Sequence, residues 1–166
     1  MKHNIGNILA AGYAIVGLAA LASCAGEQFH VTGSIANAKD SLLYFEHNGL
    51  DGFSTVDSVK LDEKGSFSFS GDKVDNPEFY RLRIAGQIIN IGIDSTETVD
   101  VKATYPQMAT DYTVKGSSEN EKIKELALKQ IDLQARCQSI LAERPDIADS
   151  IITVLMNDYK QDVSRN

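Results

Sequence analysis

Hydrophobic and polar residues alternate between residue 28 and about residue 115, which is the period of a β-strand with one buried face. The most regular run is Ser66-Phe67-Ser68-Phe69-Ser70, and we expect both phenylalanine rings to face one core. Turn residues separate such runs, as in Asp62-Glu63-Lys64-Gly65, which predicts a hairpin turn with Gly65 at positive φ. The expected strands are residues 29–35, 42–45, 54–61, 66–70, 79–84, 88–93, 98–103 and 112–115.

These short, closely spaced strands predict the fold class of the first half of the chain. Neighbouring strands that are joined by short turns usually pair antiparallel, since a parallel pair needs a longer crossover. We therefore expect residues 28–115 to form a mostly antiparallel β-sandwich or open barrel of about eight strands.

After residue 115 the pattern changes from the period of a strand to that of a helix. Ser117 or Ser118 can cap the first helix, and Glu119 and Glu121 place negative charge in its first turn, where the helix dipole favours it. The apolar residues expected on its inward side are Ile123, Leu126, Ala127, Leu133, Cys137, Ile140 and Leu141.

Pro145 interrupts this helix, and a second helix is expected over about residues 146–162. Its expected inward residues are Ile147, Ile151, Val154 and Leu155. Further apolar strips consist of Leu128, Ile131 and Ala135 on the first helix, and of Ile152, Met156 and Tyr159 on the second. Residues 116–166 thus form a helical hairpin or connector with more apolar surface than two helices need, which indicates contact with a partner or a neighbouring domain.

The first 23 residues have the pattern of an export signal. Lys2 supplies a positive charge, residues 5–22 are apolar and uncharged, and the small residues Ala22 and Ser23 precede Cys24. A transmembrane anchor is an alternative, because about 20 apolar residues span a bilayer. The segment is rich in Ala and Gly, however, and no Lys or Arg follows it to stop transfer.

Leu21-Ala22-Ser23-Cys24 resembles the lipobox of bacterial lipoproteins. The resemblance implies cleavage after Ser23 and lipidation of Cys24, with residues 24–27 as a short tether; a plain secretory signal is the alternative. Each buried methylene of an acyl chain contributes about 0.8 kcal/mol, and more than one chain gives stable anchoring. Since Ala25-Gly26-Glu27 lacks a dense acidic export tag, we expect an outer-membrane lipoprotein that faces the periplasm.

Charge and cysteine content narrow the classes of function. The whole chain of 166 residues has a net charge of −7, and removal of residues 1–23 leaves 15 basic and 23 acidic residues, a net charge of −8. This acidity and the lack of a Lys/Arg cluster argue against nucleic acid as a partner, because phosphate binding depends on clustered cations. With Cys24 lipidated, Cys137 is the single remaining thiol, so the chain has no internal disulfide and no C-x-x-C pair.

The residues that can carry chemistry form no catalytic or metal-binding motif. His30 lies in an alternating strand and His47 precedes an Asn-Gly turn, and we expect both at the surface. The carboxylates Asp57, Asp62 and Glu63, and likewise Asp94, Glu97 and Asp100, crowd two expected hairpins. We expect them to be solvated, with a calcium site as a weaker alternative. The sequence therefore predicts a protein without catalytic residues, metal or cofactor.

Two groups in the strand region have both a structural and a binding interpretation. Arg81 and Arg83 share one strand face, where cross-strand ion pairs are expected and anion binding is the alternative. The aromatic residues Tyr44, Phe45, Phe53, Phe79 and Tyr80 suit core packing, with a ligand groove as the alternative.

Five blocks occur in a fixed order between residues 29 and 120: F-H-V-T-G-S-I-A-N-A, D-S-V-K-L-D-E-K-G-S-F-S-F-S-G, P-E-F-Y-R-L-R-I, I-N-I-G-I-D and Y-T-V-K-G-S-S-E-N. Together they resemble the N-terminal domain of unknown function of bacterial envelope lipoproteins that often continue into a thioredoxin-like domain. The resemblance implies a small β domain, a helical connector and association with a thiol-disulfide oxidoreductase. The chain contains no W-C-x-x-C motif, so the redox activity is not carried over.

The leading hypothesis is a lipid-anchored, non-enzymatic accessory protein of the cell envelope. Its expected partners are the membrane, through Cys24, and a thioredoxin-like protein or domain. One alternative is the N-terminal part of a thiol-disulfide oxidoreductase whose catalytic domain lies beyond residue 166. Another is a lipoprotein that binds a small ligand in its aromatic groove.

Overall fold

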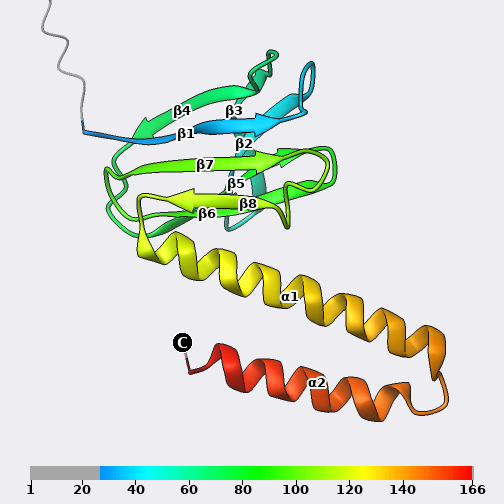
Figure 1. Cartoon of the computed structure of the whole chain (residues 1–166). Helices are drawn as coiled ribbons and strands as arrows, with labels where there is room; N and C mark the ends of the chain where they lie inside the picture. The colour runs from blue at the N-terminus through cyan, green and yellow to red at the C-terminus, as the bar shows by residue number, and fades with distance from the viewer. Residues whose placement is uncertain (1–26, 166) are drawn as a thin grey trace, which may run out of the picture.

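Eight strands form two four-stranded sheets that pack face to face, and two helices follow them (Figure 1). This computed structural model describes residues 27–165. The strands are β1 (Gln28–Ala36), β2 (Leu42–Gly49), β3 (Gly52–Lys60), β4 (Ser66–Asp72), β5 (Glu78–Ile84), β6 (Gln87–Ile93), β7 (Thr98–Thr104) and β8 (Tyr112–Lys115). The helices are α1 (Ser118–Glu143) and α2 (Ala148–Val163). Cys24 and Ser23 lie outside the described residues, so their predicted roles stay predictions.

The first sheet has the strand order β4-β1-β7-β8 and the second has the order β3-β2-β5-β6. Five of the six strand pairings are antiparallel, and β1 with β7 is parallel. The expected fold class is confirmed, and of its two forms the structure adopts the sandwich, because the sheets do not close into a barrel.

Two expected hairpins are wrong. The turn at residues 62–65 joins β3 of the second sheet to β4 of the first, and residues 94–97 join β6 to β7 across the sandwich in the same way. Gly65 does have the expected positive φ, 63°, and a Cβ there would lie 2.0 Å from the carbonyl oxygen of Ile35. The local turn was therefore readable from the sequence, whereas the sheet that each strand joins was not.

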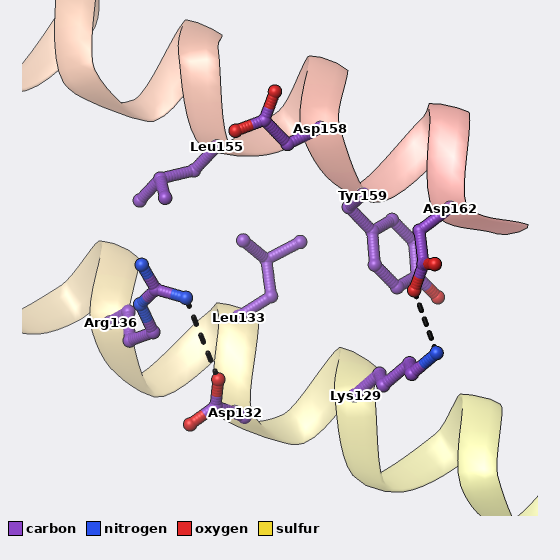
Figure 2. Close-up of a pocket in the computed structure, with 8 residues that line it drawn as sticks. All are labelled: Lys129, Asp132, Leu133, Arg136, Leu155, Asp158, Tyr159 and Asp162. Carbon is purple, nitrogen blue, oxygen red and sulfur yellow. Dashed lines mark hydrogen bonds and ion pairs between the residues drawn. The ribbon is translucent and has the colours of Figure 1, made fainter.

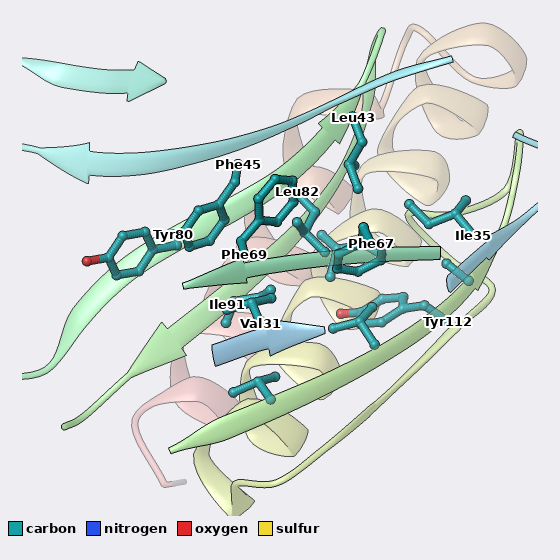
Figure 3. Close-up of a cluster of buried hydrophobic side chains, with 14 of the residues drawn as sticks. Val31, Ile35, Leu43, Phe45, Phe67, Phe69, Tyr80, Leu82, Ile91 and Tyr112 are labelled. Atoms are coloured by element: carbon teal, nitrogen blue, oxygen red, sulfur yellow. The ribbon is translucent and has the colours of Figure 1, made fainter. Parts of the chain in front are cut away.

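Alternating residues of both sheets form one core between them (Figure 3). Phe67 and Phe69 are both buried, as expected. The ring of Phe45 is stacked on those of Phe69 and Tyr80, with centroid distances of 5.2 and 5.0 Å. Two of the five aromatic residues that had two interpretations, Phe45 and Tyr80, are thus part of the core.

Helix α1 lies along the side of the sandwich formed by β6 and β8, extends beyond it, and α2 returns along α1 (Figure 1). The expected cap is confirmed: the hydroxyl of Ser117 accepts a hydrogen bond of 3.3 Å from the backbone N–H of Asn120. Within residues 27–165, neither helix has the length and apolar composition needed to cross a membrane.

The helical hairpin has almost no core of its own. The only fully buried residues of α1 and α2, within the described part of the chain, are Asn120 and Ala148. The expected inward positions of Leu141, Ile147 and Val154 are wrong, since these residues are 51%, 37% and 59% exposed. Leu141 lies near the end of α1 that extends past the strands, where no strand is available to cover it (Figure 1).

Candidate functional site

The outer face of the second sheet carries a row of residues that crosses all four of its strands. Phe53 of β3 is opposite Asn48 of β2, and Phe79 of β5 is opposite Gly92 of β6. His47 is opposite Tyr80 in the β2–β5 register, so the next residue, Asn48, lies beside Phe79. The row therefore runs Phe53, Asn48, Phe79, Gly92.

Helix α1 is attached to the last strand of this row. The side-chain oxygen of Asn120 accepts a 2.9 Å hydrogen bond from the N–H of Gly92, and its amide nitrogen donates a 2.8 Å bond to the carbonyl of Gly92. A Cβ at Gly92 would lie 2.9 Å from the Cδ1 atom of Ile123. A glycine at this position thus allows α1 to approach the strand, and one amide side chain satisfies the backbone of an edge strand.

Next to this row lies a charged cluster of Glu46, Arg81 and Arg83. The carboxylate of Glu46 accepts a 2.6 Å hydrogen bond from Nε of Arg81 and another of 2.6 Å from Nη2 of Arg83. The guanidinium carbon of Arg81 lies 3.4 Å from the ring centroid of Phe53, and that of Arg83 lies 4.4 Å from the ring centroid of Tyr44. The expected ion-pair role of the arginines is confirmed.

Glu46 is the functional partner that the sequence interpretation missed. Its side chain is 5% exposed although it stands on the outer face of the sheet. The hydrogen bond from Arg83, together with the bond and charge of Arg81, lowers the pKa of the Glu46 carboxyl in spite of its burial. The cluster has two cations and one anion, and all three side chains are less than one third exposed.

A groove of ≈ 330 Å³ lies between the exposed part of the outer row and α1; we call it the sheet–helix groove. Its lining residues are Asn48, Phe53, Phe79, Tyr80, Asn90, Ile123, Leu126, Ala127 and Gln130, none of which is charged. Phe53 and Phe79 are 47% and 53% exposed, so the expected core role is wrong for these two rings.

A second groove, of ≈ 490 Å³, follows the two helices; we call it the hairpin groove. It is lined by Gln130, Leu133, Gln134, Cys137, Leu141, Ile152 and Met156. Gln130 lines both grooves, so they meet at this residue. Neither groove has a charged lining residue, in a protein of net charge −7.

A hollow of ≈ 270 Å³ between the same helices differs in character (Figure 2). There Leu133 and Leu155 lie among charged residues, with Lys129 bonded to Asp162 at 2.7 Å and Arg136 paired with Asp132 at 3.8 Å. Ion pairs of this exposed kind contribute little to stability. They mark this hollow as a solvated part of the hairpin.

The remaining candidate residues are dispersed. His30 is exposed, and His47 is partly exposed with Nε2 2.6 Å from a carboxylate oxygen of Glu78. Within residues 27–165 no three His, Cys, Asp or Glu side chains lie close enough to hold a metal ion, and this includes the carboxylates near residues 57–63 and 94–100. Cys137 is a half-buried free thiol in the lining of the hairpin groove.

Comparison with known proteins gives limited likenesses. No curated protein matches the chain. The crystal structure of (S)-allantoin synthase is 12% identical with a TM-score of 0.38, over 55% of this chain and 44% of that one, which is less than half its length. The solution structure of the CBM25-1 of the beta/alpha-amylase from Paenibacillus polymyxa is 14% identical with a TM-score of 0.33, over 56% of this chain and 96% of that one. Likenesses this weak carry no argument about fold or function.

The sandwich and the start of α1 coincide with a family defined by sequence. A family model described as "Domain of unknown function (DUF4369)" matches residues 29–123, from the first strand to the part of α1 that lies against β6 and β8. This match covers more than half of the chain, and the protein therefore belongs to the DUF4369 family.

Proposed function

We propose that this protein is a lipid-anchored, non-enzymatic interaction module of the cell envelope, whose partner is a thioredoxin-like protein or domain. The observation that carries the proposal is the uncharged hairpin groove on a pair of helices with almost no core of their own. The order of the parts is tether, sandwich and helices, so the hairpin is the part farthest along the chain from the lipid at Cys24.

The apolar surface of the hairpin supports a protein partner. Leu141, Val154, Met156 and Ile131 are all more than one third exposed, and Leu141 and Met156 line the hairpin groove. The cores of protein interfaces are depleted in charge and enriched in apolar residues and methionine, as this groove is. The thioredoxin-like class of the partner comes from the family resemblance in residues 29–120.

The anchor is tested by replacing Cys24 with alanine. Without a thiol the acyl chains have no attachment point, and we expect the protein to move from the membrane pellet to the soluble fraction after cell lysis. Fractionation followed by immunoblotting measures the change. If the variant stays in the pellet, residues 5–22 act as a membrane helix and the lipoprotein proposal is wrong.

The partner is tested by site-specific photocrosslinking in cells. A photoreactive p-benzoylphenylalanine at position 141 lies in the hairpin groove, and one at position 56 is a control, since Val56 is 49% exposed on β3 and does not line the hairpin groove. We expect a covalent adduct with a C-x-x-C-containing, thioredoxin-like protein from position 141 only. Adducts at position 141 that contain no such protein, or equal adducts from both positions, would overturn the proposal, as would disulfide reductase activity of the purified chain.

A further inference from the structure

The sheet–helix groove has the arrangement of a ligand site. It shares Gln130 with the hairpin groove, the partner surface proposed above, and its other lining residues are different. Phe53 and Phe79 stand on β3 and β5 with Asn48 of β2 between them. Adjacent strands are 4.7–4.9 Å apart, so the two rings are placed about 10 Å apart on one rigid sheet. Two aromatic rings with an amide between them form a platform for a ligand that has more than one flat apolar face.

Both rings are open to a ligand, in contrast to the aromatic residues of the core. Phe53 is 47% and Phe79 is 53% exposed, whereas Phe45, on the inner face of the same sheet, is fully buried. Arg81 covers one face of the Phe53 ring at 3.4 Å and is itself bonded to Glu46. This contact fixes the ring in place, so little conformational freedom would be lost on binding.

The polar groups of the groove are amides. Asn48, Asn90 and Gln130 line it, and within residues 27–165 none of these three side chains has a hydrogen-bond partner in the protein. Each amide both donates and accepts hydrogen bonds, as a hydroxyl group does. The groove thus offers paired donors and acceptors from three elements: Asn48 of β2 between the rings, Asn90 of β6 and Gln130 of α1.

From these features we propose that the sheet–helix groove binds a neutral oligosaccharide. Phe53 and Phe79 contact the apolar faces of two sugar rings, and Asn48, Asn90 and Gln130 bond their hydroxyl groups. The absence of any charged lining residue disfavours an ionic ligand, and ≈ 330 Å³ lies within the usual range of ligand sites, about 300–1,000 Å³. A Gly-Ser peptide would bond the same amides, but it has no apolar face to cover the two exposed phenylalanines.

The proposal is tested by titration calorimetry on the lipidated protein in a detergent without a sugar head group. The probes are the neutral hexasaccharides cellohexaose, maltohexaose and laminarihexaose, the anionic hexamer of galacturonic acid, and a neutral Gly-Ser hexapeptide. We expect at least one neutral hexasaccharide to bind with a Kd below about 1 mM, and the anionic hexamer and the peptide to bind at least about tenfold more weakly.

Point variants test whether the hexasaccharide binds in the sheet–helix groove. Phe79→Ala should weaken binding of that hexasaccharide at least about tenfold, as loss of a central aromatic contact does, and Asn48→Asp, which keeps the size of the side chain, should weaken it as well. Val56→Ala removes an exposed apolar side chain of β3 outside the groove and should bind like the wild type. No binding of any neutral hexasaccharide, preferred binding of the peptide, or unchanged affinity in both groove variants would overturn the proposal.

Discussion

Replacing Glu46 with alanine is expected to lower the free energy of unfolding by about 3 kcal/mol. The variant leaves Arg81 and Arg83 side by side on the sheet without the carboxylate that both now bond at 2.6 Å. Glu46 is buried and the two arginines are largely covered, so water replaces the lost bonds only in part. Urea denaturation of the wild type and the variant, compared at equal m-values, measures the difference.

The matched control is Glu63→Ala. Glu63 accepts a 2.6 Å bond from Lys39, which is as short as the bonds of Glu46, but both side chains are more than half exposed. Exposed pairs of this kind contribute about 0–1 kcal/mol, so this variant should unfold nearly as the wild type does. Equal losses in the two variants would contradict the role that burial has in this prediction.

The contribution of Glu46 should also depend on pH. Its pKa is lowered in the folded protein, first by the hydrogen bond from Arg83, from the ordinary value of 4.5. A carboxyl with a lowered folded pKa stabilises the protein above its unfolded pKa, and this stability is lost as the pH falls through the folded value. The difference between wild type and Glu46→Ala should therefore be full at pH 7 and decrease below pH 4.5.

Glu46 also illustrates where the sequence stops being informative. Arg81 and Arg83 are two residues apart in a strand, so their common face was predictable. Their partner lies 35 and 37 residues earlier, in a run where Phe45 and Glu46 are both buried and the register shifts between them. Alternation is a local signal, and it does not specify which strands pair or which neighbouring side chains cover an outward-facing carboxylate.

The aromatic residues also show that a local pattern does not determine which face of a sheet becomes buried. Phe79 and Tyr80 are neighbours in β5, so one faces the core and the other faces outward. The sequence favoured core packing for all five aromatic residues, with a ligand groove as the alternative, whereas the sandwich divides them: Phe45 and Tyr80 enter the core, and Phe53 and Phe79 line the sheet–helix groove. Tyr44 is half-buried beneath the guanidinium of Arg83. The groove itself was not predictable, because it exists only where α1 lies beside the second sheet.

In the helices, the capping signal predicted the structure better than the pattern of apolar residues did. The Ser117 cap depends on four consecutive residues and was correct. Which apolar residues are buried depends on the elements that cover each side of a helix, and the apolar surface of α1 is wider than its contact with α2. Leu141 of α1, which lies past the strands, and Val154 of α2 are both exposed, although both fit a helical pattern.

The second large effect is expected at Asn120, the residue that joins α1 to the sandwich. Asn120→Ala removes both hydrogen bonds to Gly92 and leaves the N–H and carbonyl of an edge strand without partners, which should cost about 2 kcal/mol or more. Hydrogen exchange should report the loss locally, as faster exchange of the Gly92 amide and of the first turns of α1. Because Ile123 rests on Gly92, we expect the sheet–helix groove to loosen in the same variant.

One further variant tests the hydrogen bond that Asn120 donates to Gly92, and a second serves as a control. Asn120→Asp still accepts the bond from the Gly92 N–H, but at pH 7 it places a buried carboxylate oxygen against the Gly92 carbonyl, so it should be at least as unstable as Asn120→Ala. Gln138→Ala changes an exposed polar residue of the same helix beyond the sandwich and should change stability by less than about 0.5 kcal/mol. If Asn120→Ala leaves the exchange of Gly92 unchanged, α1 is held to the sandwich by its apolar residues instead, and the amide pair is not the joint between the two halves of the protein.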